Sequence, residues 1–483
     1  MMSPYFILCI ILVYFVGIYI VSHVTARKAD NSTFFIGNRK SPWFIVAFGM
    51  IGASISGVSF ISVPGWVGTS QFSYMQIVLG YLAGYAFIAL VLMPLYYKLE
   101  LTSIYTYLQK RFGETSYISG AMFFLISRTI GSAFRLFLSV SVLQYVVFDH
   151  MGVPFWLTAS CALLFVYYYT RIGGVRTIIY TDTIQTAFML FSLIGVVVIL
   201  ARFLHLDFAG VFNAIRDSNY SKVFFWTEYS DKRFFFRQFL SGAFIAITMT
   251  GLDQDLMQKN LSCKNIREAQ KNMFWFSLSL IPVNILFLVV GAMLYIFAAQ
   301  TGFVIPANSD MLFPAVATLD VMPVFFVIIF TIGLISATFA SSDSAITALT
   351  TSFTLDILKA NQKSDEYLAK TRKRVHLAIS LLIIGLIMLF HVVNNQNVIS
   401  AVFTAAGYTY GPLLGLFSFG LFTKYKLKEK LVPYVTIASP VVCLFLNFLF
   451  PDFFSFEILI INGMLTFMGL FVIRKKQIPE NAN

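Results

Sequence analysis

The chain has 483 residues, of which 58% are hydrophobic and only 12% are charged, with a formal net charge of +12. A soluble domain carries about 25% charged residues, so the composition excludes an ordinary soluble protein. A membrane helix needs roughly 20 apolar residues, and segments of that kind recur along the whole sequence. They are too long and too uniformly apolar for barrel strands, so we predict an all-α polytopic membrane protein with one transporter-sized domain over residues 1–483.

We predict thirteen membrane helices. In chain order they cover approximately residues 4–25, 42–70, 73–97, 116–147, 154–171, 179–203, 236–256, 273–299, 323–357, 375–394, 397–422, 431–450 and 455–473. In the first of these, the basic residues follow the apolar run instead of preceding it, which is the reverse of a cleaved signal peptide. We therefore expect this helix to stay in the protein, with the N-terminus outside.

The distribution of Lys and Arg predicts the orientation, because cytoplasmic loops are enriched in both. Of the 34 Lys and Arg residues, 26 fall in the predicted cytoplasmic loops, Lys259 among them, and six fall in the outer loops. The remaining two, Arg128 and Arg135, fall within helices. This bias predicts a multi-pass protein of the cell membrane with a cytoplasmic C-terminus. It also explains the positive charge without nucleic acid as a partner.

The second predicted helix contains "GMIGASISGVSFISVPG", residues 49–65, in which Gly and Pro alternate with Ser. Gly and Pro weaken a helix and free backbone groups. In a membrane, freed carbonyls are tolerated where they line a cavity or coordinate an ion. Packing of small residues between helices is the alternative explanation. The seventh predicted helix, which ends in "DQDLMQKN", is a candidate for a second interruption.

Two arginines occur in the fourth predicted helix, within "SRTIGSAFRLFLS". Arg128 lies within reach of the cytoplasmic edge, where its side chain can snorkel to water. Arg135 lies deeper, where a cation is costly and normally has an anionic partner. That partner is either a protein carboxylate or the carboxylate of a substrate. In the sixth predicted helix Asp182 lies near the cytoplasmic end, so a solvated carboxylate at a helix start is the alternative to a functional site.

The ninth predicted helix is rich in oxygen. Ten of the nineteen residues from Ser336 to Thr354 are Ser or Thr, and Asp343 lies among them. Membrane hydroxyls often bond to their own helix backbone, but this number together with a carboxylate favours a cation site. Carbonyls of a broken helix and hydroxyls of a facing helix provide the oxygens that a hard monovalent cation prefers. The sequence has no P-loop, no Gly-x-Ser-x-Gly motif and no His pair at helical spacing, so we predict no enzyme activity.

Six stretches, in order along the chain, resemble the sodium:solute symporter family. They are "GASISGVSFISVPG", "LTSIYTYLQKRFG", "GGVRTIIYTDTIQ", "DQDLMQKNL", "SSDSAITALTTSFTLDIL" and "AAGYTYGPLLGLF". The resemblance implies a leucine-transporter-type core of two inverted five-helix repeats, with the first and sixth core helices broken. The repeats would cover residues 42–203 and 236–422, and residues 4–25 and 431–473 would form additional helices.

The resemblance also implies cation sites. One Na⁺ would bind to the carbonyls of Gly52, Ile55 and Ala337 and to the side chains at positions 340 and 341, of which Ser341 has a hydroxyl. Many family members have Ser where this chain has Ala340, so one hydroxyl is missing. Some members bind a second Na⁺. The matching residues here are Asp182, Asp343 and Ser344. Asp343 replaces a Ser of those members, and we hypothesise that the two aspartates strengthen this site or that one carries a proton.

For the substrate, the resemblance implies a cavity lined by Ser54, Ser56 and Ser59. The Glu-Gln pair of galactose transporters falls at Val58 and Ser59 and is absent. Arg135 resembles the arginine with which sialic-acid members hold a carboxylate. We therefore expect a symporter that couples Na⁺ to the import of a small organic solute, with a carboxylated solute favoured, by alternating access in the lipid bilayer. A proton-coupled or sugar/polyol symporter of the same fold, and a solute channel, are the alternatives.

Overall fold

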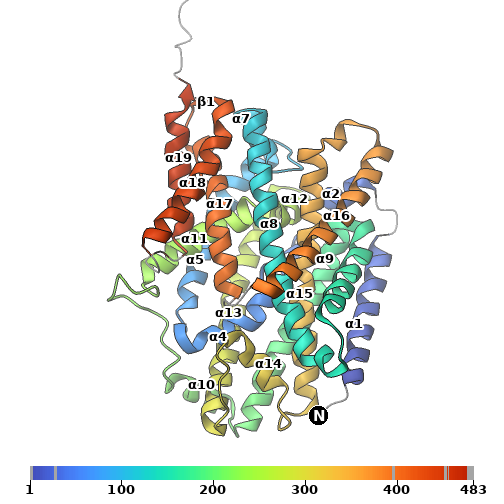
Figure 1. The fold of residues 1–483 in the computed structure, drawn as a ribbon, viewed down its shortest axis with the longest axis vertical. Coiled ribbons are helices and arrows are strands. Elements are labelled where there is room, and N and C mark those ends of the chain that lie inside the picture. The colour runs from blue at the N-terminus through green and yellow to red at the C-terminus, as the bar shows by residue number, and fades with distance from the viewer. Residues whose placement is uncertain (1–3, 27–29, 394–397, 451–453, 455, 476–483) are drawn as a thin grey trace, which may run out of the picture.

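The computed structural model describes residues 4–26, 30–393, 398–450, 454 and 456–475, and helices dominate it (Figure 1). The helices of the first half are α1 Pro4–Thr25, α2 Asn31–Ile36, α3 Trp43–Ser54, α4 Gly57–Ser70, α5 Tyr74–Phe87, α6 Met93–Lys98, α7 Thr106–Arg111, α8 Glu114–Leu143, α9 Phe155–Phe203 and α10 Phe208–Arg216. Those of the second half are α11 Phe235–Ala246, α12 Gln254–Leu261, α13 Ile266–Thr301, α14 Leu312–Ala317, α15 Val324–Ser352, α16 Asp365–Val393, α17 Val398–Phe422, α18 Val432–Leu449 and α19 Ile458–Val472. Two short strands, β1 Lys426–Leu427 and β2 Arg474–Lys475, pair antiparallel.

Among the described residues, eight helices are long and apolar enough to cross a membrane, or up to ten if each of two bent pairs is one span. This confirms the predicted all-α polytopic class, while the number thirteen stays a prediction. The predicted starts of two spans, at residues 397 and 455, lie outside the described residues. The predicted spans 154–171 and 179–203 are joined without a loop in α9. The chain bends there at Gly174, whose φ of 53° favours glycine.

Both predicted interruptions are present. The axes of α3 and α4 differ by 58°, and Ile55 and Ser56 between them have extended backbone. The axes of the second pair differ by 65°: α11 continues through a π-helical segment, Ile247–Gly251, and breaks before α12. Pro64 lies inside α4 and does not interrupt it. The first break is therefore at Ile55 and Ser56, three residues beyond Gly52.

Helix α15 positions the first break, because it packs against both α3 and α4 and also against α8 and α9. Helix α17 packs against α8 and α4, so these helices enclose the centre of the molecule. Helix α1 lies at one edge beside α9, and α18 and α19 lie at the opposite edge beside α17 (Figure 1). The two interruptions thus lie inside the bundle, where helix ends are shielded from lipid.

Candidate functional site

The first interruption leaves backbone oxygens available. The Ile55 N–H donates to the Ile51 carbonyl at 2.8 Å, and the next recorded bond across this region runs from Phe60 to the Ser56 carbonyl at 3.1 Å. Within the part of the chain that the structure describes, the carbonyls of Gly52 and Ile55 receive no hydrogen bond across the break. A cation is one of the partners that can satisfy such oxygens inside a membrane.

Helix α15 passes directly beside these oxygens. A Cβ built on Gly52 would lie 3.5 Å from the methyl group of Ala340, and one built on Gly57 would collide with Thr338. The stretch of α15 from Thr338 to Ala340 therefore lies along the break, with Ala337 and Ser341 next to its ends. The Ser341 hydroxyl is buried and donates to the Thr338 carbonyl at 3.1 Å, so its lone pairs stay available to a cation.

These residues fit Na⁺ by the chemistry of their donors. The five predicted positions Gly52, Ile55, Ala337, Ala340 and Ser341 come from two facing segments and supply three carbonyls and one hydroxyl, with no charged group. Ala340 is fully buried and has no oxygen on its side chain. The structure thus brings the segments of the predicted site together, and the Ala340 side chain carries no oxygen that could serve as a ligand there.

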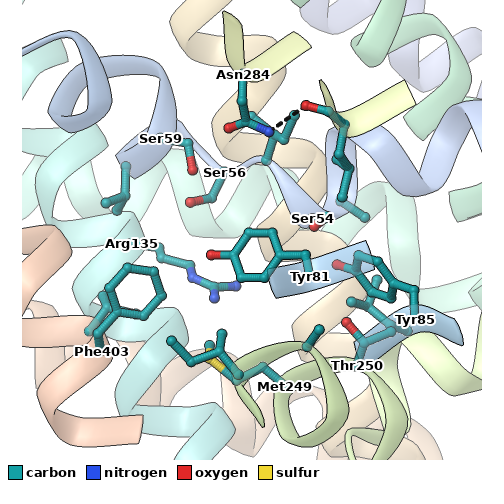
Figure 2. Close-up of a pocket in the computed structure, with 18 of the residues that line it drawn as sticks. Ser54, Ser56, Ser59, Tyr81, Tyr85, Arg135, Met249, Thr250, Asn284 and Phe403 are labelled. Carbon is teal, nitrogen blue, oxygen red and sulfur yellow. Dashed lines mark hydrogen bonds between the residues drawn. The ribbon is translucent and has the colours of Figure 1, made fainter. Parts of the chain in front are cut away.

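A separate cavity lies beside the same break (Figure 2). The four predicted substrate residues Ser54, Ser56, Ser59 and Arg135 all line it. Further lining residues, which the sequence did not single out, include Tyr81, Tyr85, Met249, Thr250, Asn284 and Phe403, from α5, the π-helical segment, α13 and α17. No local pattern marks these residues, because they reach the cavity only through helix packing.

Arg135 is the cationic group of this cavity that has no acidic partner among the described residues. Figure 2 shows its side chain reaching into the cavity between Phe403 and Tyr81. No carboxylate of the described chain lies within 4.0 Å of its guanidinium. The Ser54 hydroxyl has Tyr85 as a hydrogen-bond partner, whereas the hydroxyls of Ser56 and Ser59 make no hydrogen bond to other described residues. The cavity therefore offers one fixed positive charge and the two unused hydroxyls of Ser56 and Ser59 to a solute.

Arg128, seven residues earlier on α8, has a different environment. Its guanidinium is paired with Asp255 and lies 3.8 Å from Asp253, and only 4% of the side chain is exposed. The expectation that Arg128 snorkels to water is wrong, because the second interruption brings two carboxylates to it. Asp253 also accepts a hydrogen bond from Tyr410 on α17. These contacts use the nearby carboxylates and leave Arg135 to the cavity.

A lysine side chain, that of Lys259, contacts the residues of the predicted second cation site. Lys259 Nζ lies 2.5 Å from Asp182 Oδ2 and 2.5 Å from the Ser344 hydroxyl oxygen. Asp343 accepts hydrogen bonds from the Tyr169 hydroxyl at 2.8 Å and from the Ser344 N–H at 2.5 Å. All three predicted residues of this site, Asp182, Asp343 and Ser344, are therefore close together.

The assignment of Lys259 to a cytoplasmic loop is wrong. Its side chain is only 3% exposed, and it lies on α12, which the second break turns into the protein. Tyr169, which the sequence analysis also missed, comes from α9. The polar run "DQDLMQKN" was the signal for a functional helix end, but a run alone does not show which of its side chains point inward.

Two interrupted helices inside a bundle, with uncharged oxygens at one break and a solute-sized recess beside it, define a secondary transporter. Residues 34–429 match the sodium:solute symporter family, and the chain belongs to this family. It is a sodium-coupled symporter and a multi-pass membrane protein, in agreement with the predicted class.

The chain is similar to several characterised family members. It is 24% identical over 436 residues to the sodium/sialic acid symporter NanT of Aliivibrio fischeri, which covers 85% of this chain and 80% of the relative. It is 26% identical over 419 residues to the human sodium/iodide cotransporter, covering 82% of this chain and 61% of the relative. These relatives are transporters and not enzymes.

Solved structures show the same fold. A substrate-bound, outward-open Na⁺-coupled sialic acid symporter aligns with a TM-score of 0.83 at 19% identity, covering 97% of this chain and 98% of that one. Mhp1, a nucleobase-cation-symport-1 family transporter, aligns with a TM-score of 0.58 at 14% identity, covering 92% and 94%. The predicted leucine-transporter-type architecture, with its two broken core helices, is thereby confirmed.

Proposed function

We propose that the protein imports a small organic anion, namely a carboxylate, together with Na⁺. The observation that carries this proposal is the Arg135 guanidinium, which faces the cavity without a carboxylate partner in the described part of the chain. A cation in such a place is costly unless an anion joins it. A carboxylate suits a guanidinium well, because the two form a pair of parallel charge-assisted hydrogen bonds.

The relatives support an anionic cargo. Their names give sialic acid, iodide and monocarboxylates as the transported species, and all three are anions at neutral pH. Their shapes differ widely, so negative charge is the property they share. A fixed cation in the cavity of this chain fits that property, and the hydroxyls of Ser54, Ser56 and Ser59 suit the polar remainder of an organic solute.

Sodium binding prepares this cavity in our proposal. The carbonyls of Gly52 and Ile55 belong to the same short segment as Ser54 and Ser56. A Na⁺ that joins this segment to Ala337 and Ser341 on α15 fixes the backbone whose hydroxyls face the solute. Binding of the cation thereby completes the anion site before the repeats move relative to each other.

The inner end of the cavity is closed by ion pairs. Arg128 and Leu256 line the cavity, and Arg128 is held by Asp255 of α12. With the predicted orientation, N-terminus outside and C-terminus cytoplasmic, this contact lies on the cytoplasmic side. We propose that it separates or shifts when α12 moves and the site opens inward, as alternating access requires.

The proposal is tested with purified protein and with proteoliposomes. A thermal-shift screen against carboxylic acids, their neutral amides, sugars and amino acids, in NaCl and in choline chloride, should show stabilisation by a carboxylate that requires Na⁺. Uptake of that carboxylate should exceed equilibrium when a Na⁺ gradient is imposed. Preference for a neutral sugar would overturn the anion proposal, and uptake that merely equilibrates would favour the channel alternative.

Arg135 variants show whether this residue is the anion anchor. Arg135→Gln should weaken carboxylate binding by about 100-fold, which is the upper end of a charged hydrogen bond, whereas Arg135→Lys should retain part of the affinity. Arg216→Gln, on exposed α10, is the matched control, because its side chain is 62% exposed and pairs only at the surface. Equal affinity in Arg135→Gln and the control would exclude Arg135 as the anchor.

A further inference from the structure

We propose that the Lys259 ammonium is a permanent, built-in cation of the second site, so that this transporter binds one Na⁺ and not two. The inference rests on the proposed Na⁺-coupled function and specifies its stoichiometry. It concerns the group formed by Asp182, Asp343, Ser344 and Lys259, which the solute cavity does not include.

The contacts of Lys259 are those of a bound cation. Its Nζ atom lies 2.5 Å from a carboxylate oxygen of Asp182 and 2.5 Å from the hydroxyl oxygen of Ser344. An ammonium group and Na⁺ carry the same charge, and both are satisfied by several oxygens. A Na⁺ at the same oxygens would lie within a few ångströms of the ammonium in a poorly screened environment, where like charges repel strongly. The two cations therefore exclude each other.

Lys259 is held in place by the residues on either side of it. The Gln258 side chain donates to the Phe35 carbonyl at 2.5 Å and to the Thr351 hydroxyl at 3.0 Å. The Asn260 side chain donates to the Leu256 carbonyl at 2.9 Å. The Asn260 side chain also accepts a hydrogen bond from the Asn272 amide of α13 at 2.6 Å. The Gln258 and Asn272 contacts tie α12 to its surroundings on both sides of Lys259, so the ammonium belongs to a fixed element rather than to a mobile surface chain.

The acidic partners are fixed as well. Asp343 is oriented by the Tyr169 hydroxyl and the Ser344 N–H, and Asp182 is fully buried. Lys259 interacts electrostatically with both aspartates. With Lys259 present, the Asp182 charge is already balanced. Removal of the ammonium leaves two buried carboxylates around a space that a monovalent cation can enter.

The inference has a consequence for charge movement. One Na⁺ carried with one monocarboxylate moves no net charge, so transport by the native protein should be electroneutral. A second Na⁺ would make the same transport electrogenic. The number of sodium ions can therefore be read in two independent ways, from equilibrium binding and from current.

The first experiment measures ²²Na⁺ binding to the purified full-length protein. We expect one Na⁺ per native chain, and one per chain of Lys259→Arg, in which the charge is kept. Lys259→Met, which keeps the length of the side chain and removes the charge, should bind two. Lys259→Gln is the second neutral variant, in case the Met variant does not fold. Adding Asp182→Asn to the neutral variant should return the count to one.

The outcomes separate the inference from the proposed function. No Na⁺ binding to the native protein would overturn Na⁺ coupling itself. Two Na⁺ per native chain, or an unchanged count of one in the folded neutral variants, would overturn the role of Lys259 and leave Na⁺ coupling intact. In proteoliposomes, carboxylate uptake should generate current only in the neutral Lys259 variants, and equal current in the native protein would contradict the inference.

Discussion

The Gly52 N–H donates a hydrogen bond to the Thr186 hydroxyl oxygen at 3.0 Å, and a Cβ at position 52 would collide with that same hydroxyl. This contact holds the end of α3 close to α9. It is made by Gly52, the residue whose carbonyl is a proposed Na⁺ ligand. Because the approach is closer than any side chain allows, the position requires glycine for space.

Gly52→Ala should therefore damage both stability and Na⁺ binding. The added methyl forces α3 away from α9, and overpacking of this kind costs typically 1–3 kcal/mol. We expect a lower apparent melting temperature and a higher Na⁺ concentration for half-maximal stabilisation, measured by thermal shift in detergent.

The control for this prediction makes room for the methyl. In Gly52→Ala/Thr186→Ala the colliding hydroxyl is gone, so part of the lost stability should return even though one hydrogen bond is missing. Strictly additive losses in the double variant would show that the two residues do not interact in the way the structure describes.

Ser341→Ala should weaken Na⁺ binding without a large effect on folding. The variant removes one of the proposed Na⁺ ligands and keeps the small, buried shape. We expect the Na⁺ concentration for half-maximal uptake to rise about tenfold, which corresponds to about 1.4 kcal/mol. Ser342→Ala is a comparison from the same turn, because the Ser342 hydroxyl also donates to the Thr338 carbonyl, at 2.7 Å. An equal loss in both variants would argue against a special role of Ser341.

Ala340→Ser should have the opposite effect. Position 340 faces Gly52, and a hydroxyl there adds an oxygen at the proposed Na⁺ site. We expect the Na⁺ affinity to rise several-fold, with Li⁺ and K⁺ titrations as tests of selectivity. Ala345→Ser, elsewhere on α15 and also fully buried, is the matched control for adding a hydroxyl to this helix. No gain, or a gain in both variants, would mean that residue 340 does not face the ion.

Arg128→Met should destabilise the protein strongly. It leaves Asp253 and Asp255 buried without their cation, and breaking a buried pair costs about 3–5 kcal/mol. Thermal unfolding in detergent measures the loss. The pair variant Arg128→Met/Asp255→Leu removes both charges and should be more stable than Arg128→Met alone. If the pair variant is less stable than either single variant, the contact is not a compensating ion pair.

The sequence predicted the helical class and the two interruptions, because these depend on local composition, and the family resemblance indicated the two segments of the proposed Na⁺ site, which the structure brings together. Gly, Ser and Pro around residues 49–65 indicate a weak helix wherever it packs. They do not indicate which residue breaks it: the chain leaves the helix at Ile55 and Ser56, while Pro64 stays inside α4.

The wrong predictions concern charged residues whose partners lie far away in the sequence. Arg128 meets Asp255 across 127 residues, and Lys259 meets Asp182 across 77 residues. Taken alone, each of the two cations sits near a predicted helix end, where contact with water is the ordinary outcome. Only the bend before α12 brings them to buried carboxylates, and a single sequence carries no record of that pairing.

The break between α3 and α4 also presents two opposite electrical poles to the interior of the helix bundle. The last carbonyls of α3 form the negative end of one helix dipole, and the first N–H groups of α4, from Gly57 onward, form the positive end of another. A cation at Gly52 and an anion near Ser59 each lie at the pole that attracts it. Since thermodynamic linkage is reciprocal, Na⁺ must tighten the hold on the anion by the same factor as the anion tightens the hold on Na⁺. The break between α3 and α4 thus makes the binding of Na⁺ and the binding of the anion depend on each other.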